Sequence, residues 1–237
     1  MATVMSEFDY TIIHVNDDRV DRRNLIHDRM WNMNAQHKVF DFCYGKHDDL
    51  DEWYSRTGIF PASNTWSLNP GEIGIWQSLG SIWSSMEDNL LVFEDDVFLH
   101  DHFDNRFIES VGDLPPDADF LSLFVPEEQR QDYKYVVRYD ELGNWHPAND
   151  ENKYIFDIGS EWIARTYHGW GGQALYFTMQ GAEKLLRIAR ARGMYTTSDC
   201  FLYLEAHAGN INGYSVLPEY YDTVYIDKST KSIIQER

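Results

Sequence analysis

The sequence predicts an α/β fold with a mixed, mainly parallel central sheet. Three observations indicate it: short apolar runs typical of buried strands, segments of helical periodicity, and alternation of the two along the 237 residues. Strands that alternate with helices usually form one sheet with helices on its faces. No internal repeat or linker interrupts the sequence, so we expect a single domain over residues 1–237.

The first third of the sequence predicts two strands with a helix between them. Residues 10–15 form the first apolar run, and the polar residues 16–19 end it in a turn. Apolar residues at near-helical spacing predict a helix over residues 21–33. A second short strand is expected over residues 38–44, whereas the acidic, aromatic-rich stretch 47–67 gives no clear prediction.

The centre contains the strongest helix signal. Asn69 suits the N-cap, Pro70 suits the first helical position, and the Glu72 carboxylate can reach back to the cap amide. One broad apolar face follows, made of Ile73, Trp76, Leu79, Ile82, Trp83 and Met86. Because a buried-strand pattern comes next at residues 90–93, we expect this helix to pack on the sheet.

The second half of the sequence continues the alternation of predicted strands and helices. A short strand is expected within residues 119–124, and the polar stretch 127–152 predicts a long loop or hairpin. Residues 174–178 predict another strand, followed by a helix over residues 180–192 that ends at Gly193. Two further apolar segments lie at residues 214–217 and 220–226.

Composition and charge restrict the class of function. The chain is 43% hydrophobic and 15% aromatic, which is ample for a folded core. Its 39 acidic residues outweigh 20 lysines and arginines and give a net charge of −19. A surface this acidic repels phosphate backbones and no dense basic cluster offsets it, which argues against a nucleic acid partner.

The cysteines and the apolar runs indicate a cytoplasmic, soluble protein. Cys43 and Cys200 lie far apart, which is typical of free thiols in a reducing compartment. The N-terminus lacks the pattern of a signal peptide. No apolar run reaches the roughly 20 residues that span a bilayer, so we expect no transmembrane segment.

Three consecutive acids follow the apolar run at residues 90–93. Glu94, Asp95 and Asp96 stand at the mouth of the predicted strand, and ligands of open α/β sheets bind at the carboxyl ends of strands. Two carboxylates at i and i+2 on a strand share a face, so Glu94 and Asp96 can share a hard cation together with the phosphates that it carries. A solvated acidic strand end is the alternative.

The centre of the chain resembles a known family. The helix start Gly71-Glu72-Ile73-Gly74, with Ser78 and Trp83 further along, and then the run from Leu91 to Val97, resemble the core signature of glycosyltransferase family 25, of the lipooligosaccharide galactosyltransferase type. Two positions depart from the family pattern, since Ile75 stands where cysteine is usual and Leu79 where histidine is usual.

Weaker matches lie outside this core. The first strand with Asn16 and Arg22, and the late strand and helix over residues 174–186, are similar to the corresponding family segments. Asp199 stands where the family carries an aspartate. Asn16 is followed by aspartate, where the family usually has leucine.

The resemblance implies a single GT-A type, Rossmann-like domain that moves a hexose, galactose or glucose, from a UDP-sugar to a hydroxyl of a glycan or glycoconjugate. It also implies a divalent metal, such as Mn²⁺, and inversion at the anomeric carbon. Glu94 and Asp96 are then the metal ligands, and Asp95 faces the sugar or ribose of the nucleotide-sugar donor. Asn16 and Arg22 would help to bind that donor, although asparagine is equally a turn former and arginine equally a surface charge.

Asp199 is the candidate catalytic base, because a displacement needs a carboxylate that is separate from the metal ligands. The residues before Asp199 are also typical of an ordinary helix start. Glu205 is a second candidate. His207 and His168 are weighed as an added metal ligand, although a lone histidine is more often a surface or core residue.

Two other classes of function compete with transfer. A metal-dependent phosphohydrolase would need further ligands near the acids, and only His100, Asp101 and His102 offer them. A catalytically silent member of the fold would bind glycans or proteins through aromatic loops, for which Trp145 and Trp170 are best placed.

Overall fold

The structure is a computed structural model that describes most of the secondary structure of the chain. The described residues are 9–13, 20–39, 50–62, 68–125, 138–139, 145–146, 163–166, 171–216 and 223–226. Within these ranges, no helix is long and apolar enough to cross a membrane.

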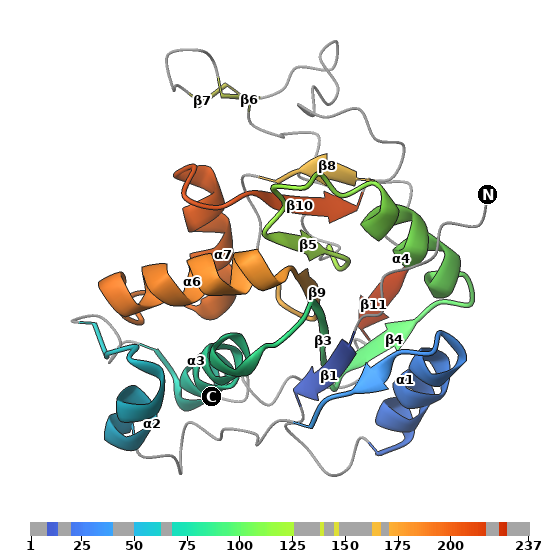
Figure 1. Cartoon of the computed structure of the whole chain (residues 1–237), viewed down its shortest axis with the longest axis horizontal. Helices are drawn as coiled ribbons and strands as arrows, with labels where there is room; N and C mark the ends of the chain where they lie inside the picture. The colour runs from blue at the N-terminus through green and yellow to red at the C-terminus, as the bar shows by residue number, and fades with distance from the viewer. Residues whose placement is uncertain are drawn as a thin grey trace.

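A seven-stranded sheet forms the centre of the molecule (Figure 1). In spatial order its strands are β2 (Gln36–His37), β1 (Asp9–Ile13), β3 (Leu90–Glu94), β9 (Ala174–Phe177), β5 (Phe120–Ser122), β10 (Gly213–Val216) and β8 (Ile163–Arg165). β1 is parallel to β2 and β3, and β5 is parallel to β10. β9 lies antiparallel between β3 and β5, and β8 is antiparallel to β10. Most of these strands therefore run in one direction, and the predicted mixed sheet is confirmed.

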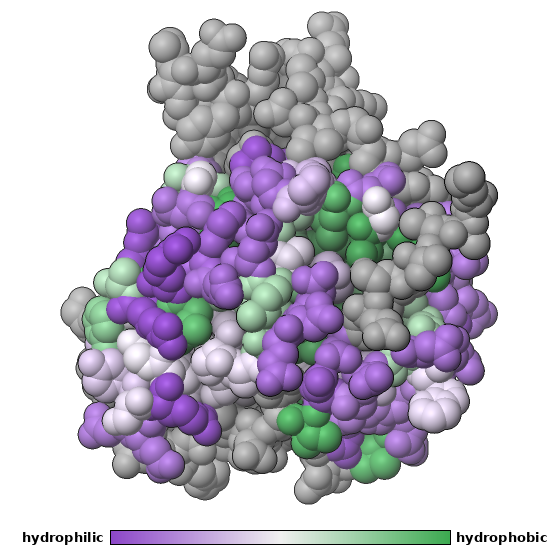
Figure 2. Space-filling view, in the orientation of Figure 1, coloured by the Kyte–Doolittle hydropathy of each residue, from purple (hydrophilic) through white to green (hydrophobic). Residues whose placement is uncertain are grey.

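Side chains of the central strands alternate between the two faces of the sheet. Leu90 and Val92 of β3 join the core on one face, and Leu91 and Phe93 join the core on the other. The first face packs against α2 (Leu50–Thr57), α3 (Pro70–Ser85), α6 (Met179–Arg192) and α7 (Ser198–His207). The second packs against α1 (Val20–Asn32), α4 (Phe103–Gly112) and the antiparallel ribbon of β4 (Val97–Leu99) and β11 (Val224–Ile226). Burial on both faces explains the continuous apolar runs that predicted these strands. On the outside, hydrophilic residues cover much of the described surface in the view of Figure 2.

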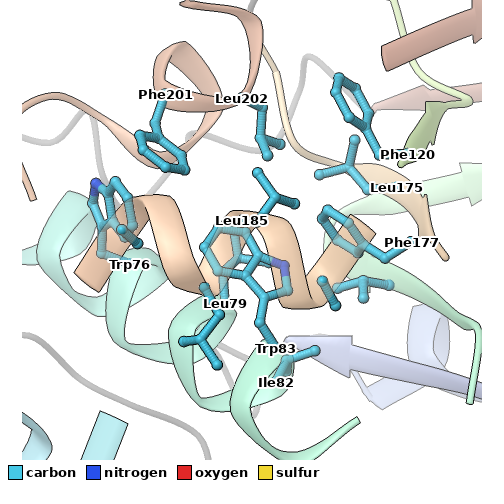
Figure 3. Packing of buried hydrophobic residues seen from close by; sticks show 14 of the residues in the cluster. Trp76, Leu79, Ile82, Trp83, Phe120, Leu175, Phe177, Leu185, Phe201 and Leu202 are labelled. Atoms are coloured by element: carbon cyan, nitrogen blue, oxygen red, sulfur yellow. The ribbon is translucent and has the colours of Figure 1, made fainter. Parts of the chain in front are cut away.

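Aromatic side chains join α3 to α7 and to the sheet (Figure 3). Trp83 meets Phe177 of β9 with ring centroids 5.8 Å apart, and Trp76 meets Phe201 of α7 at 4.9 Å. The Trp76 indole also donates a hydrogen bond to the Thr196 carbonyl, just before α7. Such pairs contribute roughly 0.5–1.5 kcal/mol each beyond area burial. They hold the beginning of α7 beside the first half of α3.

Two predicted helix ends are confirmed. Asn69 and Glu72 form the capping box: the Glu72 amide donates to Asn69 Oδ1 at 3.0 Å, and the Asn69 amide donates to Glu72 Oε2 at 2.7 Å. α6 ends at Gly193, whose φ of 71° is the left-handed conformation that glycine adopts without a steric penalty. In the stretch predicted as a loop or hairpin, β6 (Arg138–Tyr139) pairs antiparallel with β7 (Trp145–His146).

Other local predictions need correction. The second strand is β2, so residues 38 and 39 lie after it, and most of the predicted segment 38–44 lies outside the described residues. α2 occupies part of the stretch that gave no prediction. α4 was not predicted at all; its buried apolar residues, Phe103 and Phe107, form only one i, i+4 pair, which is too short a pattern to indicate a helix.

Candidate active site

The three acids lie where β3 ends and turns into β4. Glu94 is the last residue of β3, and Asp95 and Asp96 form the turn. The expectation that Glu94 and Asp96 share one face of a strand is therefore wrong, because the strand stops at Glu94. Both residues still lie at the carboxyl end of β3, Glu94 as its last residue and Asp96 in the turn before β4.

The three carboxylates differ in exposure. Asp95 is fully buried, with 0% of its surface exposed. Glu94 and Asp96 are each half-buried. Glu94 and Asp96, the predicted metal ligands, are therefore the two acids with exposed surface, although Oδ1 of Asp96 is itself buried. Contact between Asp95 and a donor would require its neighbours to move.

A short segment before β9 connects Glu94 with Asp199. The Glu94 amide donates to the Gln173 carbonyl at 2.9 Å, and a β-carbon on Gly172 would lie 3.5 Å from Glu94 Oε1. The Gly171 amide donates to Asp199 Oδ2 at 2.9 Å. Glu94 and Asp199 thus contact adjacent residues of one segment, although they lie more than a hundred positions apart in the sequence.

Glycine is required at one position of this segment. Gly171 has a φ of 96°, a conformation that residues with a β-carbon rarely adopt. The geometry aims the Gly171 amide at Asp199. Glycines 171 and 172 belong to a glycine-rich run that precedes a predicted strand, and this pattern was the only sequence signal for the segment.

Asp199 is the second residue of α7, and its carboxylate is held by two backbone amides. Besides the Gly171 amide at Oδ2, the Cys200 amide donates to Oδ1 at 2.8 Å. Thr197 is the N-cap residue, and its side chain does not cap a backbone amide of the first turn. An acidic residue in the first turn interacts favourably with the partial positive charge of the helix N-terminus.

The beginnings of α3 and α7 converge near Asp199. Burial raises the pKa of the Cys200 thiol; a hydrogen bond with Thr197 lowers it, and the negative charges of Asp199 and Glu72 raise it. Glu72 therefore lies close enough to Cys200 for its charge to act there, and it belongs to the first turn of α3. Each of these two helix N-termini already carries a carboxylate, Glu72 in α3 and Asp199 in α7, which offsets the partial positive charge there.

Glu205 lies in a different environment from Asp199. It is fully buried and accepts hydrogen bonds from Arg192 Nη1 at 2.6 Å, the Tyr195 hydroxyl at 2.7 Å and Asn210 Nδ2 at 2.7 Å. Burial and then the Glu205 carboxylate raise the pKa of Tyr195 to about 12. These contacts give Glu205 a structural role that ties α7 to the end of α6. His207 is the last residue of α7, at the opposite end of the helix from Asp199.

The remaining predicted residues are only partly described. Asn16, His168 and Trp170 lie outside the described residues, as do the side chains of Arg22 in α1 and of Trp145 in β7. Across the described ranges, no three His, Cys, Asp or Glu side chains converge as a preformed metal site.

The residues that a phosphohydrolase would use have local partners. The rings of His100 and His102 lie 4.0 Å apart between their centroids. Arg29 of α1 lies 3.6 Å from carboxylate oxygens of both Asp101 and Asp104. These contacts join α1 to the beginning of α4.

Comparison with known proteins decides the family. The family model described as "Glycosyltransferase family 25 (LPS biosynthesis protein)" matches residues 11–202, which run from β1 into α7. The chain belongs to glycosyltransferase family 25. The predicted family is thereby confirmed, and the protein is an enzyme that transfers a glycosyl group from a sugar donor to an acceptor.

The other comparisons add little. No curated protein matches the family 25 chain. Among solved structures, it is similar to one titled "crystal structure of a glycosyltransferase involved in the glycosylation of the major capsid of PBCV-1". The identity is 10%, the match covers 81% of this chain and 69% of the other, and the TM-score is 0.36.

Proposed function

We propose that this family 25 enzyme transfers a hexose, galactose or glucose, from a UDP-sugar to a hydroxyl of a glycan or glycoconjugate, with inversion. The domain would be of the GT-A type, and the activity that of a lipooligosaccharide galactosyltransferase. One observation carries the proposal: residues 171–173 bring Glu94 and Asp199 together at the carboxyl edge of the sheet. The edge thereby supplies separate carboxylates for the donor side and the acceptor side of one reaction.

A divalent cation fits the donor side of this edge. Glu94 and Asp96 are half-buried and offer carboxylate oxygens, which are the ligands that Mg²⁺ and Mn²⁺ prefer. Such ions are often held by one or two carboxylates together with substrate phosphates, so two protein ligands suffice. Bound there, the cation would neutralise the charge that develops on the diphosphate leaving group.

Asp199 suits the acceptor side. Each of its oxygens accepts one amide hydrogen bond, and each keeps a lone pair with which it can accept a further proton. In the proposed step the acceptor hydroxyl oxygen bonds to the anomeric carbon, the bond from that carbon to the diphosphate oxygen breaks, and the hydroxyl proton passes to Asp199. UDP leaves with the electron pair of the broken bond.

A thermal-shift screen tests which nucleotide sugar is the donor and whether its binding depends on a metal ion. Ligands that bind only the native state raise the apparent stability. We expect UDP-galactose or UDP-glucose to raise the unfolding temperature in the presence of Mn²⁺ and much less with EDTA. Transfer of labelled hexose to a glycan acceptor should show the same dependence. A shift equal with and without metal would reject metal dependence, and release of free phosphate from simple esters would favour a phosphohydrolase.

A further inference from the structure

A hollow of about 600 Å³ lies away from the candidate active site. Its wall is made by α2, by the second half of α3, by the end of α6 and by the beginnings of β1 and β3. The lining residues are Asp9, Lys38, Val39, Arg56, Ser81, Ser84, Ser85, Met86, Glu87, Asp88, Leu90 and Arg190. From Glu72, near Asp199, to Ser84 is roughly 18 Å along α3, at 1.5 Å for each residue.

Two arginines line this hollow, and each is held by one hydrogen bond to the protein. Arg190 Nε donates to the Thr57 carbonyl at 2.7 Å, and Arg56 Nη2 donates to Ser81 Oγ at 3.2 Å. Within the described part of the chain, neither guanidinium forms an ion pair. These single contacts fix each group while leaving most of its N–H donors available.

The lining also carries Lys38 and three acids, Asp9, Glu87 and Asp88, none of which forms an ion pair with either arginine. Lys38 pairs with Asp9, at 3.2 Å between Nζ and Oδ2. Glu87 and Asp88 lie on the rim, beyond ion-pair distance of both guanidinium groups. In a chain of net charge −19, a lining in which three basic residues balance three acids is less acidic than the chain as a whole. Carboxylate and phosphate groups are the ligands that match a guanidinium best.

The rest of the lining suits hydroxyl groups. Ser84 and Ser85 are exposed, and their hydroxyls donate to the Ser81 carbonyl at 2.9 and 2.8 Å, so the lone pairs of both can accept from a ligand. Glu87 and Asp88 add carboxylate acceptors on the rim. The volume lies within the roughly 300–1,000 Å³ of small-molecule sites. We propose that this hollow binds an acidic saccharide, with its carboxylate or phosphate on Arg56 and Arg190 and its hydroxyls on the serines and rim acids.

Saturation-transfer NMR with the whole chain, without donor or metal, tests this binding apart from any transfer activity. The probes are methyl glucuronide, glucose 6-phosphate and the neutral methyl glucoside. We expect at least one acidic probe to bind about tenfold or more tightly than the neutral one, and the stronger of the two identifies the acidic group. Equal binding of all three would overturn the proposal.

Three variants locate the site. Arg56→Gln and Arg190→Gln should each weaken binding of the acidic probe about tenfold, since each substitution removes a charge-assisted hydrogen bond. Arg187→Gln is the matched control, because Arg187 is an exposed arginine of the same helix, α6, that does not line the hollow. Circular dichroism checks that each variant is folded. An equal loss of probe binding in Arg187→Gln, or no loss of probe binding in Arg56→Gln and Arg190→Gln, would refute the assignment of the site to this hollow.

A fourth variant separates this hollow from the candidate active site. Asp96→Ala should leave binding of the acidic probe unchanged, because Asp96 does not line the hollow. Loss of binding in Asp96→Ala would instead place the probe at the acidic edge of the sheet and would contradict a second site.

Discussion

Substitution of Asp199 by asparagine separates a catalytic role from a structural one. The two side chains have nearly the same shape, but asparagine has one acceptor oxygen where aspartate has two. The Gly171 and Cys200 amides both donate to Asp199, so one of these two bonds is lost and the other becomes a bond to a neutral group. We expect the free energy of unfolding to fall by about 1–3 kcal/mol. For a chain of this size, that corresponds to about 2–4 °C in Tm for each kcal/mol.

The effect on transfer should be much larger than this loss of stability. A positioned general base typically contributes roughly 10²–10⁴ in rate, so kcat for Asp199→Asn should fall by that factor. The donor KM should change little, because the donor contacts assigned to Glu94 and Asp96 remain. The assay is transfer of labelled hexose at saturating donor, with thermal unfolding of the same preparation measured in parallel.

The alternative role of Asp199, an ordinary residue of a helix start, predicts a different result. In that case Asp199→Asn would lower the Tm by a few degrees and leave kcat almost unchanged. A kcat within threefold of the unchanged enzyme, measured on folded protein, would falsify the assignment of Asp199 as the base. Asp199→Glu adds a check, because it keeps the carboxylate while displacing it from the Gly171 amide.

Three further outcomes follow from the described contacts. Asp96→Ala should abolish metal-dependent donor hydrolysis and transfer while leaving Tm within a few degrees, and undiminished turnover would reject Asp96 as a metal ligand. Gly181→Ala should destabilise the protein by several kcal/mol in urea unfolding, because its β-carbon would lie 2.0 Å from the Asp119 carbonyl oxygen; Gly112→Ala, where nothing lies within 4 Å, is the control that should stay near neutral. Burial and then the Arg23 charge lower the pKa of His27, so its contribution to stability is present above pH 6.5 and is lost as the pH falls through the lowered pKa; His27→Gln should flatten the fall of Tm between about pH 7 and 5.

The sequence predicts best those features that depend on local chemistry. The capping box at Asn69 and Glu72 is a contact between residues three positions apart, and the structure confirms both of its bonds. β3 and β9 are predicted because burial on both faces produces continuous apolar runs. Short edge elements are harder to predict: β2 has only two residues, both exposed, so its sequence carries no burial pattern.

The candidate site was predicted in parts that the sequence could not connect. The acids at residues 94–96 stand out because charge interrupts a buried strand. Asp199 stood out only through resemblance, and nothing local indicates that it lies near Glu94. Their proximity depends on the antiparallel insertion of β9 beside β3, which brings Gly171 and Gly172 to the end of β3. This is long-range pairing, and no local pattern encodes it.

α3 relates the candidate active site to the hollow that carries Arg56 and Arg190. Its first turn holds Glu72 near Cys200, the residue after Asp199, and Ser81, Ser84 and Ser85 of its last turns line the hollow. Between these ends the helix is tightly enclosed, since a β-carbon on Gly80 would lie 2.7 Å from the Trp53 ring. Close-packed helices move as rigid bodies rather than stretch. The separation of the two proposed sites is therefore set by the helical rise, so the proposed saccharide in the hollow and the proposed donor at the end of β3 would bind without overlap.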